Sequence, residues 1–209
     1  KIIYSFGIDG DEAMSDLSYA TPTRFSPLGL QARPVHIKAA AVLLGTLVLA
    51  IASQISVPML PVPMTMQTLA VMLIGALYGW RLGALTVLAW LGEAALGLPV
   101  LANGAGGLAP FMGPTAGYLA SFPLVVALVG WLAKRGWNGS RPAFAFAAML
   151  LGHALCLTLG GLWLAKLIGL EKALLAGVVP FLLGSLVKSG LGAAILTALA
   201  RRTYKADQA

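Results

Sequence analysis

The stretch G-L-P-V-L-A-N-G-A-G-G-L-A-P-F-M-G-P-T-A-G-Y-L occupies residues 97–119 and contains six glycines, three prolines and no charged residue. Glycine frees φ, and proline fixes φ and removes a backbone donor, so this run is not one regular helix. A soluble loop of this length normally carries charge, whereas this one carries none and is flanked by long apolar runs. We therefore expect residues 97–119 to form part of a ligand pocket at a membrane face.

The composition indicates an all-α integral membrane protein. Of the 209 residues, 59% are hydrophobic and only 10% are charged, whereas a soluble domain averages about 25% charged residues. The net charge of +7 does not indicate nucleic acid as a partner, because Lys and Arg lie in short clusters between apolar runs, as the positive-inside bias produces. The single cysteine, Cys156, cannot form an intrachain disulfide.

Three regions follow from the distribution of polar residues. Residues 1–36 form a polar N-terminal tail, of which residues 1–13 are either a tag or upstream extension before Met14 or part of the natural chain. Residues 37–200 form a six-helix membrane domain, and residues 201–209 form a basic C-terminal tail.

Six apolar runs in this domain predict six transmembrane helices, since a bilayer requires about 20 residues per helix. The predicted spans are residues 37–56, 64–80, 82–98, 115–133, 143–165 and 180–200. The second span is the shortest, and residues 173–179 are expected to form a separate short segment.

The basic residues predict the orientation. Six spans place both termini on one side, together with Arg24, Arg33, Lys38, Arg81, Lys134, Arg135, Arg141, Arg201, Arg202 and Lys205. Only Lys166 and Lys172 fall on the other side. We therefore expect a multi-pass protein of the inner (cytoplasmic) membrane with both termini in the cytoplasm. The connections at residues 57–66, 99–114 and 166–179 then share the outward face.

Lys188 is the most informative single residue. It lies about eight residues, or roughly 12 Å, into the last span. A charged Lys at mid-span costs about 2.5–3.5 kcal/mol and needs a partner or a wet cavity. It either snorkels, pairs with Glu93, or provides the counter-charge for an anionic ligand, and we favour the ligand. Glu93, the only acid inside a span, is either that partner, a protonated carboxyl group, or an acceptor for ligand N–H groups.

Three further polar residues, Asn103, Thr65 and Gln67, each have two interpretations. Asn103 offers the donors and acceptor that suit a urea or amide group, but Asn also favours turns because it tolerates the left-handed conformation. Thr65 and Gln67 lie at the mouth of the second span, where satisfying local backbone is the alternative to ligand binding. Tyr118, like the tryptophans, is by default an interfacial anchor.

The sequence does not indicate metal, cofactor or catalytic chemistry. His153 and Cys156 lie three residues apart, but no further Cys or nearby His completes a metal site. No nucleophile–base spacing links Ser189, His153 and Glu93. The G-A-G-G-L-A run at 104–109 lacks the preceding strand and following acid of a dinucleotide site, and G-S-L-V-K-S at 184–189 lacks the second glycine of a phosphate-binding loop.

Two blocks of the sequence resemble a known protein family. P-V-P-M-T-M-Q-T-L-A-V-M-L-I-G-A-L-Y-G at residues 61–79 and the glycine-rich run at 97–119 resemble the BioY family, the biotin-binding substrate-capture proteins of energy-coupling-factor vitamin transporters. The resemblance covers about residues 37–200. It implies six helices, with biotin held near the outer face and loops closing over it.

The resemblance also implies roles for particular residues. Asn103 matches the loop Asn that meets the ureido ring, and Lys188 matches the last-helix Lys that meets the valerate carboxylate. Many members carry an Asp three residues before that Lys, where this chain has Ser185, whose hydroxyl can still accept an N–H without the charge assistance. The complete expected ligand-binding set is Lys188, Asn103, Ser185, Glu93, Tyr118, Gln67 and Thr65.

The expected function is high-affinity biotin uptake. The resemblance alone implies coupling to a separate transmembrane subunit and cytoplasmic ABC-type ATPases, and we expect the small residues Ala41 and Gly45 of the first span to form the docking face. A stand-alone secondary transporter of a small organic anion, an intramembrane enzyme and a purely structural bundle are the alternatives. Membrane lipid surrounds the domain in each case, and the sequence leaves the oligomeric state, including a homo-oligomer, open.

Overall fold

The structure is a computed structural model that describes residues 28–206, except the side chains of Gln31 and residues 203–206. Residues 1–13 and Met14 therefore lie outside the described residues. The helices are α1 (Val35–Gln54), α2 (Gln67–Ala95), α3 (Ala116–Lys134), α4 (Pro142–Ile168), α5 (Leu170–Gly177) and α6 (Val179–Ala206). The short elements are η1 (Leu30–Ala32), β1 (Ser56–Val57), β2 (Met64–Thr65), η2 (Ala102–Gly104) and η3 (Ala109–Phe111).

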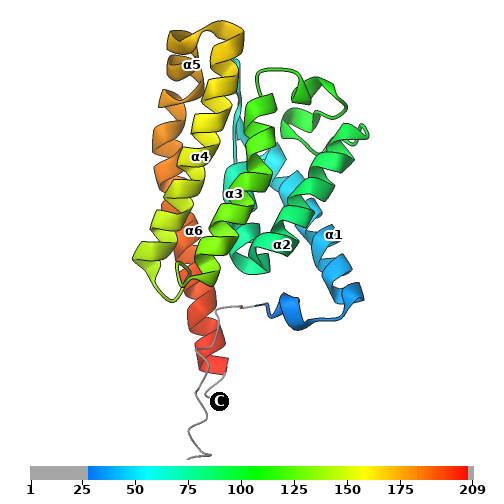
Figure 1. Cartoon of the computed structure of the whole chain (residues 1–209), viewed down its shortest axis with the longest axis vertical. Helices are drawn as coiled ribbons and strands as arrows, with labels where there is room; N and C mark the ends of the chain where they lie inside the picture. Colours follow the sequence, from blue (N-terminus) through cyan, green and yellow to red (C-terminus); the bar gives the residue numbers. More distant parts are fainter. Residues whose placement is uncertain (1–27, 207–209) are drawn as a thin grey trace, which may run out of the picture.

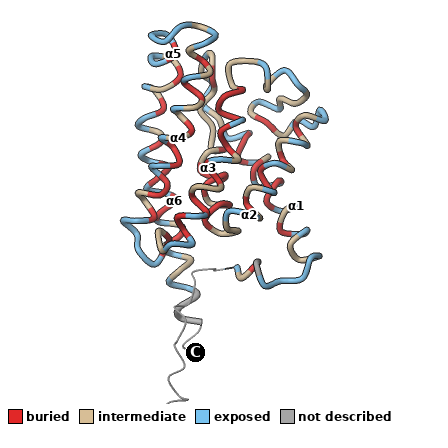
Figure 2. Tube along the Cα trace, in the orientation of Figure 1, coloured by how far each residue is buried: buried red, intermediate tan, exposed pale blue. Residues whose placement is uncertain are grey.

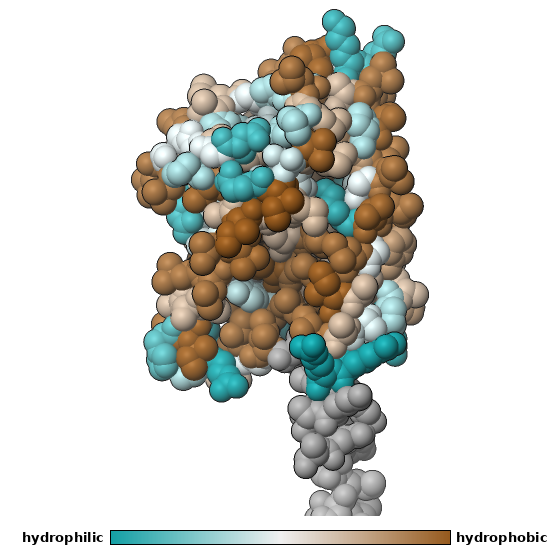
Figure 3. All heavy atoms as spheres, turned by 180° about the vertical axis from the view of Figure 1, so that it is seen from behind, coloured by the Kyte–Doolittle hydropathy of each residue, from teal (hydrophilic) through white to brown (hydrophobic). Residues whose placement is uncertain are grey.

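Five helical segments of the described chain are long and apolar enough to cross a membrane. They are α1, α2, α3, α4 and the segment Leu170–Arg202, which contains α5 and most of α6. Figure 3 shows that apolar side chains cover most of one face of the molecule. On α1, Leu43, Leu44 and Leu47 are each more than half exposed, as expected for side chains whose solvent is lipid. The protein is therefore a multi-pass membrane protein.

The second and third predicted spans are joined in one helix, α2, that folds back on itself. Gly79 has φ 79° and ψ 167°, a conformation open to glycine but not to an L side chain. A Cβ added at Gly83 would lie 3.3 Å from the Cα of Gly75, although eight residues of a straight helix span about 12 Å. Residue 79 is therefore a sharp turn, and the structure has five membrane-length segments where the sequence predicts six.

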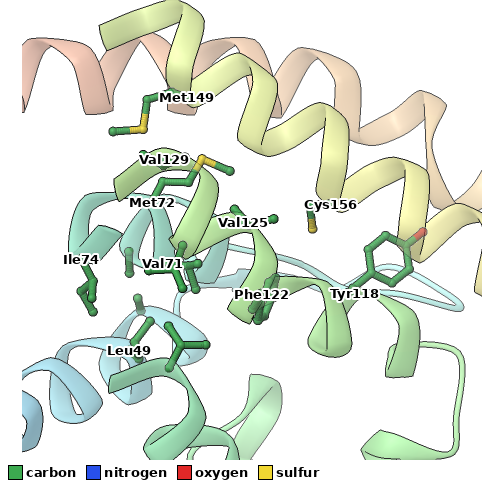
Figure 4. Close-up of a cluster of buried hydrophobic side chains, with 14 of the residues drawn as sticks. Leu49, Val71, Met72, Ile74, Tyr118, Phe122, Val125, Val129, Met149 and Cys156 are labelled. Carbon is green, nitrogen blue, oxygen red and sulfur yellow. The ribbon is translucent and has the colours of Figure 1, made fainter. Parts of the chain in front are cut away.

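Glycines allow α3 to pack closely against this turn. A Cβ added at Gly130 of α3 would lie 2.6 Å from the backbone nitrogen of Trp80 and 2.8 Å from the oxygen of Gly75. α3 is also the most buried of the membrane-length helices (Figure 2). Figure 4 shows the adjoining core, in which Met72 of α2, Val129 of α3 and Met149 of α4 converge.

The expected docking face on α1 is wrong for the two small residues assigned to it. Ala41 and Gly45 are buried, and a Cβ added at Gly45 would lie 3.2 Å from the Tyr78 ring. The Tyr78 hydroxyl donates a hydrogen bond to the oxygen of Ala41 at 3.0 Å. Small residues permit close approach of any neighbour, and here that neighbour is α2 of the same chain.

The irregular connections gather at one end of the bundle. Figure 1 shows α5 and the loop that carries η2 and η3 at the upper end, whereas α6 ends at the lower end. The proline-rich connection contains a two-residue antiparallel ladder that the sequence did not predict, with Ser56 opposite Thr65. α1 begins two residues before the predicted boundary, and α6 continues through residue 206, beyond the predicted end at 200.

The α2–α3 contact predicts the effect of one methyl group. Gly130→Ala should destabilise the protein by about 1–3 kcal/mol, because the new Cβ overlaps backbone atoms that cannot rotate away. Thermal unfolding in detergent measures this as a lowered Tm. Gly92→Ala is the matched control, since Gly92 lies within α2 and a Cβ there meets nothing within 4 Å. Equal Tm values for the two variants would contradict the proposed tight contact.

Candidate functional site

A cavity of about 240 Å³ lies between β2, the start of α2, the η2–η3 loop, α3, α4 and α6. The predicted stretch 97–119 contributes eight of its lining residues. The polar members of the lining are Thr65, Gln67, Thr68, Asn103, Thr115, Tyr118, His153, Ser185 and Lys188. The cavity therefore brings together six of the seven predicted ligand-binding residues.

The loop that covers this cavity is fixed by side chains from neighbouring helices. Gln54, at the end of α1, donates to the oxygen of Leu101 at 3.0 Å and accepts from the backbone N–H of Gly104 at 3.1 Å. The indole N–H groups of Trp90 and Trp163 donate to the oxygens of Val100 and Gly113, respectively. The glycine- and proline-rich loop is thus held in a defined conformation by hydrogen bonds from side chains of α1, α2 and α4.

Lys188 is a buried cation with neutral partners. Its side chain is 8% exposed, and Nζ donates to the oxygen of Thr65 at 3.0 Å and to Thr68 Oγ1 at 2.9 Å. It forms no ion pair with any carboxylate in the described part of the chain. Two neutral acceptors leave the third N–H and the full charge for another group. Because Thr65 lies in β2 and Thr68 in the first turn of α2, these two hydrogen bonds join both elements to α6.

Gln67 and Thr65 line the cavity and also organise the start of α2. The backbone N–H of Gln67 donates to Thr65 Oγ1, which supports the first turn. The Gln67 amide donates to Ser53 Oγ at 2.9 Å and thereby ties α2 to α1. These contacts agree with the local interpretation, while both residues remain in the cavity wall.

Tyr118 forms an aromatic wall rather than an interfacial anchor. It is buried, and its hydroxyl donates to the oxygen of Gly177 at 2.7 Å. Its ring stacks on Phe181 with centroids 6.3 Å apart, and Phe122 lies nearby in the same lining. The interfacial interpretation is therefore wrong for Tyr118.

Asn103 and Ser185 lie on different elements of the wall. Asn103 has φ 57°, is exposed at the loop, and its Oδ1 accepts from Ser56 Oγ at 3.1 Å. Its left-handed conformation fits the turn interpretation, and its place in the lining fits ligand binding. Ser185 of α6 is 5% exposed, and its hydroxyl has no hydrogen-bond partner among residues 28–206.

Glu93 is not part of this site. It does not line the cavity, and it forms no ion pair with Lys188. A helix rotates by about 100° per residue, so the buried neighbours Trp90 and Ala94 face the core while Glu93 remains partly exposed. The pairing of Glu93 with Lys188 is therefore wrong, and the role of Glu93 as a ligand acceptor stays a prediction that its place outside this lining does not support.

One residue of the lining, His153, was not among the expected ligand-binding residues. His153 of α4 lies in the cavity wall with Cys156, one turn along the same helix. No group of three or more His, Cys, Asp or Glu side chains suited to a metal ion exists in the described residues. An ionisable side chain within an apolar span is by itself a sign of function, and this sign was available in the sequence.

His153 also touches Ser189, but the pair does not resemble a catalytic dyad. His153 Nδ1 lies 3.1 Å from Ser189 Oγ and 3.1 Å from the oxygen of Met149. Ser189 is fully buried and does not line the cavity, so its hydroxyl does not face a substrate. These contacts fix the orientation of the imidazole ring.

Comparison with known proteins identifies the family. The family model described as the BioY family matches residues 24–205 of this chain. The chain belongs to the BioY family. The match includes every element that lines the cavity, so the resemblance of residues 61–79 and 97–119 is confirmed.

Individual BioY relatives cover the central part of the chain. The probable biotin transporter BioY of Pyrococcus horikoshii is 36% identical over 123 residues, which are 59% of this chain and 71% of the relative. The biotin transporter BioY of Rhizobium etli is 40% identical over 122 residues, 56% of this chain and 65% of the relative. The alignments thus span about two thirds of these relatives.

A solved structure shares the fold. The S-component for biotin from an ECF-type ABC transporter aligns with a TM-score of 0.70 and 28% identity, over 79% of this chain and 92% of that chain. The expected all-helical membrane architecture of a BioY protein is therefore confirmed at the level of the fold.

The contacts of Gln54 predict how the covering loop is held. Gln54→Ala should raise amide hydrogen exchange at Gly104 by about 10-fold, because it removes two hydrogen bonds between α1 and the loop. Gln54→Glu retains an acceptor for Gly104 and should give a smaller increase. Thr197→Ala, whose hydroxyl bonds within α6, is the control. Unchanged exchange in Gln54→Ala would show that the loop is held by other contacts.

Proposed function

We propose that this protein binds biotin with high affinity and carries it across the cytoplasmic membrane as the substrate-specific subunit of an energy-coupling-factor transporter. The observation that carries the proposal is the Lys188 ammonium, buried in a loop-covered cavity without an ion-pair partner among the described residues. Membership in the BioY family, with relatives named biotin transporters, supports the choice of ligand.

Lys188 is proposed to bind the valerate carboxylate. A buried cation is stabilised most by an anion that accepts a short, charge-assisted hydrogen bond. The neutral oxygens of Thr65 and Thr68 orient Nζ without neutralising it. A carboxylate therefore completes the set of acceptors and removes the uncompensated charge from the low-dielectric interior.

The remainder of biotin matches the rest of the lining. Its ureido ring needs both donors and acceptors, which the amide of Asn103 and the unpartnered hydroxyl of Ser185 offer. Its ring system and aliphatic chain need apolar surface, which Leu119, Phe122 and Phe181 supply. Gln67, Thr65 and Tyr118 complete the wall, with their polar atoms partly engaged by the protein.

We propose an orientation with the cavity outward and both termini in the cytoplasm. If the two halves of α2 each cross the bilayer, the chain has the six crossings that the sequence predicts. The turn at Gly79 and the α3–α4 connection then share one side with the basic residues Arg81, Lys134, Arg135, Arg141, Arg201 and Arg202. The positive-inside bias makes that side cytoplasmic, where a coupling subunit and ABC-type ATPases would act.

A stand-alone secondary transporter of a small organic anion is the alternative function. It is compatible with the same cation and the same cavity, and it differs in the source of energy. Catalysis is not part of the proposal, because the BioY relatives are named biotin transporters.

Calorimetric titration tests the binding site. The purified protein should bind biotin with 1:1 stoichiometry, and Lys188→Ala should weaken binding by about 100-fold, since the carboxylate then enters the cavity without a counter-charge. Biotin should also bind more tightly than its amide. Lys172→Ala, an exposed lysine on α5, is the control. Wild-type affinity in Lys188→Ala would remove Lys188 from the site.

Uptake measurements distinguish the two transport functions. In cells that express this chain with a coupling subunit and ATPases, uptake of labelled biotin should persist when the ion gradient is collapsed and ATP is maintained. Inactivation of the ATPases should abolish uptake. The opposite pattern would establish the secondary transporter and contradict the energy-coupling-factor assignment.

A further inference from the structure

His153 presents an unused hydrogen-bonding atom at the cavity. It is 2% exposed and belongs to the same lining as Cys156 and the α6 residues Ser185 and Lys188. Nε2 is fully buried and has no hydrogen-bond partner in the described part of the chain. A buried polar atom without a partner costs free energy, so such an atom in a cavity wall indicates a missing partner.

The contacts of the other ring nitrogen determine what Nε2 can do. Nδ1 lies 3.1 Å from the backbone oxygen of Met149, and a carbonyl oxygen only accepts hydrogen bonds. Nδ1 therefore carries the proton, and the neutral ring leaves a bare lone pair on Nε2. A second proton would place a cation close to the Lys188 ammonium, with no carboxylate paired to either group among residues 28–206. His153 thus offers an acceptor.

We propose that Nε2 of His153 accepts a hydrogen bond from an N–H group of the bound ligand. This inference rests on the proposed function and deepens it. The carboxylate of biotin is ionised and has no donor, so the donors that biotin offers are the two N–H groups of its ureido ring. The proposal therefore places one ureido N–H against α4.

Ser185 lies beside this position and can take the second N–H. Ser185 and Ser189 are four residues apart on α6 and share one face of that helix. Ser189 Oγ touches the His153 ring, so that face of α6 directs the Ser185 hydroxyl toward the same part of the cavity. Two neutral acceptors, a hydroxyl and an imidazole nitrogen, then recognise the two donors of a cyclic urea.

Titration of matched variants with two ligands tests this contact. The variants are His153→Leu, which removes the acceptor, and His153→Gln, whose side-chain oxygen can occupy the position of Nε2. Met149→Leu is the packing control, because Met149 is buried on α4 outside the cavity lining. The ligands are biotin and biotin methylated on its ureido nitrogens, which lacks the donors.

For biotin, His153→Leu should weaken binding by about 10-fold, whereas His153→Gln and Met149→Leu should remain within about 3-fold of wild type. For the methylated ligand, His153→Leu should bind no more weakly than wild type, because no donor is present to lose its acceptor. If His153→Leu does not fold, His153→Asn replaces it, since the shorter amide ends near the position of Nδ1.

The outcomes separate this inference from the proposed function. Biotin binding by wild type together with an unchanged affinity in His153→Leu, or with an equal loss for both ligands, overturns the His153 contact alone. Failure of the wild-type protein to bind biotin overturns the proposed function and this contact with it.

Discussion

The constraint on which this structure depends is the positive charge of Lys188 inside a membrane helix. The side chain is almost fully buried and is held by two neutral oxygens, without an ion pair in the described residues. An ammonium group in such a place is costly unless a cavity, water or an anion compensates it. The cavity beside Lys188, and the uncharged loop that covers it, follow from this requirement, as does the proposal of an anionic ligand.

The fold brings the partners of Lys188 to it over a long distance in sequence. Thr65 of β2 and Thr68 of α2 lie more than 100 residues before Lys188, and α2 turns back at Gly79. Close contacts among Gly75, Gly83 and Gly130 allow that turn to pack against α3, whose first turns form the aromatic wall. Glycine is thus used in two ways, because it permits close helix packing in the core and an irregular covering loop at one end of the bundle.

The amino-acid composition and the positions of glycine and proline predicted much of the fold and of the cavity. The density of glycine and proline in 97–119 excluded a regular helix, and its lack of charge indicated a membrane-associated pocket, which the structure places around the cavity. The direction in which side chains point from each helix was not predictable. Glu93 is turned away from the site, the small residues Ala41 and Gly45 pack against α2, and His153 reaches the cavity, because helix rotation and neighbour choice are set by tertiary packing. These contacts between helices cannot be read from the sequence of a single chain.

A crystal structure of the protein with biotin bound would show directly whether Lys188 binds the carboxylate of the ligand. We expect biotin inside the cavity, with a carboxylate oxygen about 2.7–2.9 Å from Lys188 Nζ, the distance of a charge-assisted hydrogen bond. Biotin outside this cavity, or a carboxylate remote from Lys188 with the ammonium still bonded to neutral oxygens alone, would contradict the account.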